Sequence, residues 1–343
     1  MKICLYGAGA VGGFIGAHLA KAGCEVNVVE VGATLKALQQ HGIRVQKETE
    51  FLQQKVNATD NPAALGVQDL IVIAVKAPTL VQVAKGIAPL IGPQTIVMPT
   101  MNGLPWWFFD GVGGPYAGTR LEAVDPGGAI AAAIPTHHVV GCVVHGSFWS
   151  REPGLVGHGF GKHLVIGEPD GSESERTRSL AALLSKAGFD VKLSRDIRTD
   201  IWFKLWGNMN TSPISAITGA TLDLILDDPL VNRFCLNIME EAARIGERVG
   251  CRITQSGEER NAMARELGAF KPSMLQDVEL GKQIELDAHV TVVRDIGKMV
   301  GEPTTNIDIL LGLTRLYAQV HGLYPALKRT TVASALTDFG RKH

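Results

Sequence analysis

The first thirty residues constrain the fold more than any other stretch of the chain. An apolar run at 2–6 ends in Gly7-Ala8-Gly9-Ala10-Val11-Gly12, and a segment rich in glycine and alanine continues to residue 22. A second apolar run occupies 25–29. Parallel strands need a long crossover connection, which a helix usually supplies. The pattern therefore predicts a strand, a glycine turn, a helix and a second, parallel strand.

The glycines of this G-x-G-x-x-G pattern each suit a different requirement of dinucleotide binding. Gly7 permits the tight turn, Gly9 lets the backbone approach a pyrophosphate, and Gly12 lets the helix pack closely on the strand. The helix N-terminus then faces the anion. Glu30 ends the second apolar run, where an acidic residue usually meets the adenosine ribose. The cofactor-binding candidates are thus Gly7, Ala8, Gly9, Ala10, Val11, Gly12 and Glu30.

Chance is the competing explanation of the glycine pattern, because the chain contains 39 glycines. The complete strand, turn and helix context argues against it. Lys76 is a further candidate, because it follows the apolar run 70–75 and would lie at the carboxyl end of a strand, where ligands of such sheets bind. A solvated loop lysine explains that position equally well.

The remaining patterns predict two domains. A chain of 343 residues is long enough for about two, and the runs at 70–75 and 95–98, with helical patterns between them, predict a doubly wound sheet. Shorter runs at 139–145, 164–167 and 190–193 predict its far edge, and helical periodicity follows at 201–209, 230–249, 284–299 and 304–320. We predict an α/β fold, with an N-terminal Rossmann-type doubly wound sheet over 1–195 and a mostly α-helical C-terminal domain over 196–343.

Composition excludes several kinds of partner. The chain has 33 basic and 34 acidic residues, a net charge of -1, and no cluster of Lys or Arg that would bind a phosphate backbone, so no nucleic acid is expected. Glycines interrupt the apolar N-terminus, which argues against a signal peptide. The chain also has no run of about eighteen apolar residues, the length that a membrane-spanning helix needs.

Cysteine and histidine patterns argue against a metal site. The five cysteines lack the spacing of zinc ligands, so we expect reduced thiols and a cytoplasmic location. The pair His137-His138 would point to opposite faces of a β-like run, and no carboxylate is spaced to complete a ligand set with His145 or His158. We predict no metal.

One lysine in the second half has the chemistry that ketone reduction needs. Hydride transfer leaves negative charge on the carbonyl oxygen, so the site needs a donor that can also release a proton. Lys204 and Asn208 are four residues apart and share a helix face, while bulky apolar residues cover the remainder of the helix. Lys204 is therefore the candidate general acid, and a helix-surface cation is the alternative.

These residues resemble the ketopantoate reductase (2-dehydropantoate 2-reductase) family, and the resemblance covers almost the whole chain. It rests on Trp202-Phe203-Lys204-Leu205 with Asn208 and Pro213, on Asn102-Gly103, on Ser273-Met274-Leu275-Gln276-Asp277, and on Glu285-Leu286-Asp287. The Ser-Met-Leu-Gln-Asp string and the Lys204 helix are specific to the family, whereas the glycine pattern is not.

The resemblance implies reduction of 2-dehydropantoate to pantoate by NADPH in pantothenate and coenzyme A biosynthesis. It makes Lys204 the general acid and oxyanion donor, and gives Glu285 a part in binding the substrate hydroxyl. It further implies that Asn102 and Asn208 orient substrate and nicotinamide. The resemblance also implies that Ser273 contacts the substrate carboxylate and that Lys76 lies beside the cofactor. A helix cap explains Ser273 as well.

Three positions depart from the family pattern. Ser212, the remaining substrate-binding candidate, stands where an asparagine is common, and Val290-Thr291 replace a common Asn-Gly pair. Glu30-Val31-Gly32 lack the arginine that is usual in NADPH-binding members. The Glu30 carboxylate would accept hydrogen bonds from the 2′-hydroxyl of NADH but repel the 2′-phosphate of NADPH, although Lys36 could reach that phosphate. NADPH is the expected cofactor, with NADH possible because of Glu30.

Two other functions fit the same pattern. One is an NAD(P)-dependent reductase of another small 2-keto acid, or an imine dehydrogenase, on the same two-domain plan. The other is a non-catalytic NAD(P)-binding regulator, against which stand Lys204 and Glu285. A homodimer is possible, because the apolar helices of the second domain offer an interface.

The segment 104–128 has two interpretations. It carries Trp106, Trp107, Phe108, Phe109 and Tyr116 among glycines and prolines, too many aromatics for a disordered loop. It either forms a lid that covers the keto acid and narrows specificity, or packs against the helical domain or another subunit.

Overall fold

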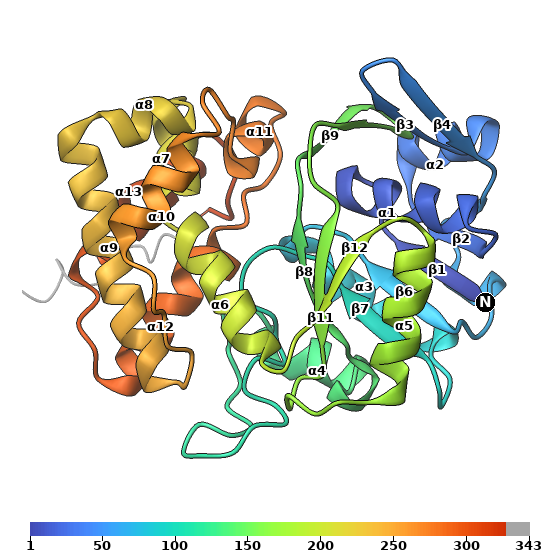
Figure 1. Ribbon diagram of the computed structural model, residues 1–343, viewed down its shortest axis with the longest axis horizontal. Helices are drawn as coiled ribbons and strands as arrows, with labels where there is room; N and C mark the ends of the chain where they lie inside the picture. Colours follow the sequence, from blue (N-terminus) through green and yellow to red (C-terminus); the bar gives the residue numbers. More distant parts are fainter. Residues whose placement is uncertain (327–343) are drawn as a thin grey trace, which may run out of the picture.

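The computed structural model describes residues 1–326, and an α/β half and a helical half lie side by side in it (Figure 1). Five parallel strands form the predicted sheet in the order β5-β2-β1-β6-β7. The order reverses beside β1, and doubly wound sheets bind ligands at such a switch point. The bounds are β1 Lys2–Tyr6, β2 Glu25–Val29, β5 Asn57–Thr59, β6 Leu70–Ile73 and β7 Ile96–Pro99, with helices α1 Ala10–Lys21, α2 Gly32–His41 and α3 Leu80–Gly86.

A second sheet, which the sequence patterns did not predict, covers helix α1. A Cβ atom on Gly13 of α1 would lie 2.7 Å from Cγ2 of Val156 in this sheet, and the rings of Phe14 and Phe148 are 4.5 Å apart. Helix α1 is therefore packed between two sheets, which explains why it has no polar face. The strand order is β4-β3-β10-β9, with bounds β3 Ile43–Lys47, β4 Glu50–Gln54, β9 Phe148–Glu152 and β10 Leu155–His158.

The three strands expected at the far edge lie beyond β7, as a separate sheet in the order β12-β11-β8. An isolated parallel bridge from Val97 to Val139 connects β7 to the segment that precedes β8. The bounds are β8 Gly141–His145, β11 His163–Gly167 and β12 Asp190–Leu193, and α5 Glu175–Lys186 packs on this sheet. The short helices of this half are η1 Pro62–Ala64, η2 Ala77–Thr79, η3 Ala88–Leu90, η4 Pro126–Gly128, α4 Ala129–Ala133 and η5 Thr136–His138.

The C-terminal half is helical, as its periodicity predicted. Asp196 caps the first helix, because its side chain accepts a hydrogen bond from the Thr199 backbone N–H at 3.1 Å. Pro213 lies in the first turn of the next helix, so it marks a helix start. The bounds are α6 Ile197–Asn208, α7 Thr211–Thr218, α8 Leu222–Asp227, α9 Pro229–Arg248, α10 Gly257–Arg265, α11 Ser273–Glu279, the π-helix η6 Asp287–Thr291, α12 Val292–Val300 and α13 Thr305–Val320.

The aromatic part of segment 104–128 belongs to the core. Trp107 and Phe108 are 1% and 0% exposed, and the Phe108 ring lies 5.8 Å from that of Trp202 in α6. The Arg198 guanidinium covers Phe108 at 4.7 Å and donates a hydrogen bond to its carbonyl oxygen. The structure thus supports packing against the helical half. The lid interpretation stays a prediction for the rest of the segment.

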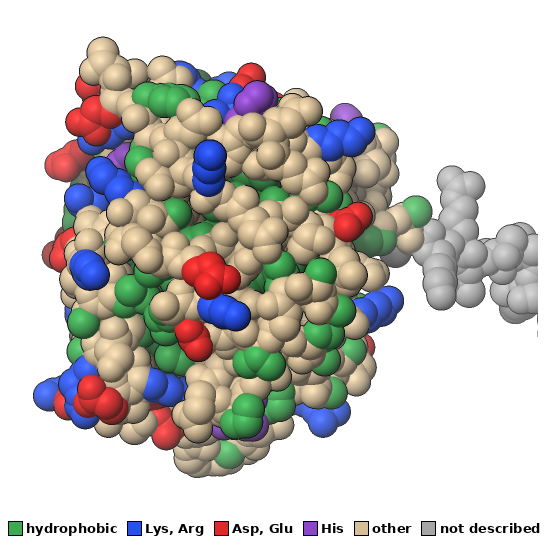
Figure 2. All heavy atoms as spheres, turned by 90° about the vertical axis from the view of Figure 1, so that its right-hand side faces the viewer, with side chains coloured by type: hydrophobic (Ala, Val, Ile, Leu, Met, Phe, Trp, Pro, Cys, Tyr) green, Lys and Arg blue, Asp and Glu red, His purple; other side chains and the backbone are tan. Residues whose placement is uncertain are grey.

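The helices, the potential metal ligands and the surface charge of the described residues bear on which partners the protein could bind. Within residues 1–326, no helix is long and apolar enough to cross a membrane, and no three His, Cys, Asp or Glu side chains are grouped to hold a metal ion. Figure 2 shows the face of the N-terminal half, on which positive and negative side chains are interspersed. This face therefore presents no continuous basic surface.

Candidate active site

The glycine turn between β1 and α1 has the shape that a pyrophosphate needs. Gly7 has a φ of +94°, and a Cβ atom there would lie 2.8 Å from Cγ1 of Val75. A Cβ atom on Gly12 would lie 2.1 Å from the Gly7 carbonyl oxygen, so only glycine allows this close approach of helix and strand. Around Gly9 there is open space within 4 Å, and no side chain caps α1. The helix N-terminus is thus accessible to an anion.

Glu30 lies directly against this turn. Its Oε2 atom accepts a hydrogen bond from the Ala8 backbone N–H at 2.8 Å, and its Oε1 atom accepts one from Val31 N–H at 3.1 Å. The carboxylate is therefore held in place at the end of β2. Lys36 is exposed on α2, the helix that follows.

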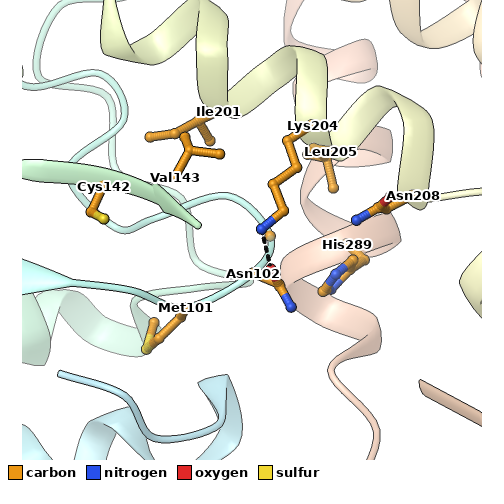
Figure 3. A pocket seen from close by; sticks show the side chains of 10 residues that line it. Met101, Asn102, Cys142, Val143, Ile201, Lys204, Leu205, Asn208 and His289 are labelled. Carbon is orange, nitrogen blue, oxygen red and sulfur yellow. Dashed lines mark hydrogen bonds between the residues drawn. The ribbon is translucent and has the colours of Figure 1, made fainter. Parts of the chain in front are cut away.

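A small pocket that is open to solvent lies between the two halves and brings together three of the predicted residues. Lys204 and Asn208 enter it from α6, and Asn102 enters from the loop after β7 (Figure 3). It is lined by Met101, Asn102, Gly103, Cys142, Val143, Ile201, Lys204, Leu205, Asn208 and His289.

The Lys204 ammonium is the central group of this pocket. Its Nζ atom donates to Oδ1 of Asn102 and to the Val144 carbonyl oxygen, both at 2.7 Å. Burial lowers the pKa of Lys204 to about 8, although Cys142 and Glu285 partly oppose that shift. Only two protein acceptors hold the three ammonium hydrogens in the described residues, so one hydrogen is available to a ligand.

A π-helical turn forms the wall opposite α6. Gly103 has a φ of +86°, and a Cβ atom there would lie 2.6 Å from the Ala288 carbonyl oxygen. That oxygen accepts a hydrogen bond from Leu104 N–H at 2.8 Å, so the turn fixes the loop that carries Asn102. His289 of the same turn reaches the pocket, and burial lowers its pKa. The sequence analysis missed His289, and only its position four residues after Glu285 could have indicated it.

Lys76 and Glu285 contact each other across the two halves. The Lys76 Nζ atom lies 3.0 Å from Oε2 of Glu285 and 2.8 Å from Oδ2 of Asp277, and Oε1 of Glu285 accepts a hydrogen bond from Ala77 N–H at 2.9 Å. Lys76 follows β6 at the carboxyl edge of the sheet. Asp277 was not predicted as a site residue, although it belongs to the Ser-Met-Leu-Gln-Asp string.

The structure does not bring the two serine candidates into the pocket wall. Ser212 is buried in the first turn of α7, and Ser273 is the half-buried first residue of α11. These two helices pack against each other. Pro272 rather than Ser273 occupies the cap position of α11, so a capping role does not account for Ser273.

The fold and the site together define an NAD(P)H-dependent oxidoreductase. The glycine turn lies at the switch point of a doubly wound sheet, and a lysine of lowered pKa lies in the pocket between the halves. Residues 3–106 match the model of ketopantoate reductase PanE/ApbA, and residues 196–318 match its C-terminal model. The chain belongs to the ketopantoate reductase family.

Individual relatives agree with this placement. The chain is 44% identical to a 2-dehydropantoate 2-reductase of Mesorhizobium japonicum, over 94% of this chain and 100% of the relative. A crystal structure assigned to a ketopantoate reductase of Ralstonia solanacearum MolK2 is 56% identical and has a TM-score of 0.91, over 94% of this chain and 99% of that one. A D-mandelate dehydrogenase solved with NADH and anilino(oxo)acetate, 20% identical with a TM-score of 0.80 over 94% and 100% of the two chains, shares the fold.

Proposed function

We propose that this protein is a 2-dehydropantoate 2-reductase that forms pantoate with NADPH as the reductant. The observation that carries the proposal is the Lys204 ammonium, held by Asn102 and the Val144 carbonyl in the pocket between the halves. An idle nucleotide-binding regulator would have no use for a lysine whose pKa is lowered to about 8.

The residues of the glycine turn suit the dinucleotide. Gly9 leaves room for the pyrophosphate, and the uncapped first turn of α1 offers backbone N–H groups to its oxygens. Residues 7–12 would hold the phosphates, and Glu30 would lie beside the adenosine ribose. The nicotinamide, when bound, supplies the hydride for the keto carbon.

Lys204 would act on the keto oxygen. Its remaining N–H would donate to that oxygen and stabilise the negative charge that reduction creates there. The ammonium would then transfer a proton to the alkoxide, which leaves an alcohol and a neutral amine. A pKa of about 8 keeps most of the lysine protonated at neutral pH and makes it a stronger acid than an ordinary lysine.

The other candidates would position the reactants. Asn102 holds the Lys204 ammonium in place through its Oδ1 atom, and its amide group would orient substrate and nicotinamide. Glu285 would accept a hydrogen bond from the substrate hydroxyl, because each of its oxygens already binds one donor and retains a second acceptor site. Asn208 would contact the substrate from α6. Ser212 and Ser273 would also contact the substrate, although neither lines the pocket wall.

The choice between NADPH and NADH depends on Glu30. The family resemblance favours NADPH, whereas a carboxylate beside the ribose disfavours a 2′-phosphate. The exposed Lys36 on α2 is the cation available to offset it. We propose NADPH as the cofactor, with NADH accepted as well.

The second candidate function is reduction of another small 2-keto acid. It is favoured by the shared fold of D-mandelate dehydrogenase, because one fold serves several substrates. The test is oxidation of NADPH, and separately of NADH, with 2-dehydropantoate and with 2-keto acids of other side chains. The proposal predicts the highest kcat/KM for 2-dehydropantoate. A clearly higher value for another keto acid would replace it with the second candidate.

A homodimer and the division at residues 195 and 196 are also proposals. Helix α13 exposes Ile309, Leu313, Leu316 and Val320 along one face, which supports association of the helical halves. A solution mass of twice 36.7 kDa by light scattering would support the dimer, and a mass of 36.7 kDa would exclude it. The start of α6 at Ile197 supports the division.

A further inference from the structure

Three charged side chains connect the two halves beside the pocket. Lys76 comes from the carboxyl edge of the sheet, while Asp277 and Glu285 come from the helical half, more than two hundred residues later in the chain. The Asp277 and Glu285 side chains are only 7% and 5% exposed, and that of Lys76 is 43% exposed. One ammonium group is thus shared by two buried carboxylates.

The two carboxylates have different tasks in this arrangement. Neither side chain lines the pocket wall, but Glu285 binds both Lys76 and Ala77 N–H and its charge raises the pKa of Lys204, whereas the Asp277 side chain binds only Lys76 in the described residues. Burial raises the pKa of Asp277, and Lys76 opposes that shift. A buried carboxylate is costly unless it is paired, so Asp277 must have Lys76 as its partner.

We propose that Asp277 is a positioning residue for the reduction. By binding the same Lys76 ammonium at 2.8 Å, it keeps that ammonium on Oε2 of Glu285 and fixes the orientation of the Glu285 carboxylate. This inference rests on the proposed function, because the task of Glu285 is to bind the substrate hydroxyl. Asp277 acts only through Lys76 and Glu285, so its removal should impair recognition of that hydroxyl.

The test compares two substrates of the holoenzyme. Asp277→Asn has the same shape without the charge, and its kcat/KM for 2-dehydropantoate should fall about tenfold, mainly through a higher KM, as expected for a weakened hydrogen bond to a charged group. With 2-ketoisovalerate, which lacks the hydroxyl, kcat/KM should stay within about twofold of the wild type. Asp277→Glu, which restores the charge, should recover part of the loss.

A control variant and a double-mutant cycle with Lys76 distinguish a positioning role of Asp277 from a general structural effect. Glu279→Gln removes the same charge from the same helix, where Glu279 pairs with Lys271 at 2.6 Å on the exposed side, and it should leave both substrates unchanged. In a Lys76→Met background, Asp277→Asn should cause no further loss of kcat/KM for 2-dehydropantoate, because the ammonium that connects Asp277 to Glu285 is absent.

The outcomes distinguish the two proposals. A wild-type enzyme that reduces no 2-keto acid overturns the proposed function, and this inference with it. If the wild type is active, three results would each overturn the role of Asp277 and leave the proposed function standing. These are equal losses of kcat/KM on both substrates, additive effects of Lys76→Met and Asp277→Asn, and full activity of Asp277→Asn on 2-dehydropantoate.

Discussion

The protonation state of Lys204 sets the expected pH dependence of the enzyme. Its pKa of about 8 means that the protonated form declines as the pH rises through 8. Reduction needs that form, so kcat for reduction should be constant below this pH and fall about tenfold per pH unit above it. Oxidation of pantoate needs the neutral amine and should rise through the same range. A reduction rate that stays constant up to about pH 10 would contradict the assignment.

Glu30 should govern the choice of cofactor. Glu30→Gln keeps an acceptor for Ala8 N–H but removes the charge, so kcat/KM for NADPH relative to NADH should rise about tenfold. The matched control is Glu25→Gln, which neutralises the exposed first residue of the same strand and should leave the ratio unchanged. An unchanged ratio in Glu30→Gln would show that the 2′-phosphate lies elsewhere.

Individual site residues were predictable only so far as local spacing fixed them. The four-residue spacing of Lys204 and Asn208 placed both on one helix face, and both line the pocket. The contact between Lys76 and Glu285, 209 positions apart, depends on how the two halves meet, which no local pattern records. The need for glycine at position 103 could not be predicted either. It arises because the Ala288 carbonyl oxygen lies too close to Gly103 for a Cβ atom to fit.

At the scale of elements, helix α13 depends on one buried carboxylate. Glu241 of α9 is 4% exposed and accepts hydrogen bonds from Asn306 N–H at 2.9 Å and Ile307 N–H at 3.0 Å. These donors belong to the first turn of α13, where a negative charge is favourable.

Glu241→Ala should therefore lower the free energy of unfolding by about 2–3 kcal/mol, because it leaves those donors buried and unpaired. Thermal or urea unfolding would measure the change. Glu240→Ala, at the exposed neighbouring position, should cost less than about 0.5 kcal/mol. Equal stability of Glu241→Ala and the wild type would show that water caps α13 as well as Glu241 does.

Helices were easier to predict than the second sheet. The apolar periodicity of α9 and α13 extends over 20 and 16 residues, long enough to identify a helix. Strands β3, β4, β9 and β10 have five residues or fewer, and β4 has no buried residue. The alternation of buried Ile43 and Val45 in β3 is too short to identify a strand. The pairing of β3 with β10 joins segments about a hundred residues apart, so it depends on tertiary structure.

At the scale of the whole molecule, segment 104–128 connects the two halves through its buried aromatic residues. Trp107→Ala should lower the free energy of unfolding by about 3–5 kcal/mol and leave the ratio of kcat/KM values among 2-keto acids of different size unchanged. Phe51→Ala, which removes a ring that is 57% exposed, is the matched control and should cost little. A changed substrate ratio at wild-type stability would instead support the lid interpretation.

The two-half architecture was predictable in outline because each half has its own hydrophobic period. The position of the pocket between the halves was not, since it is formed by the loop after β7, by β8, by α6 and by the π-helical turn. The Asn102 side chain and the Lys204 ammonium are 102 positions apart and meet only in the folded molecule.

The most direct test of the central claim is the turnover of Lys204→Ala with 2-dehydropantoate and NADPH. Because the variant loses both the general acid and the charged donor to the developing alkoxide, kcat should fall by about a hundredfold or more. The Kd for NADPH should stay unchanged, because the glycine turn is intact. A kcat close to that of the wild type, measured on folded protein, would contradict the account.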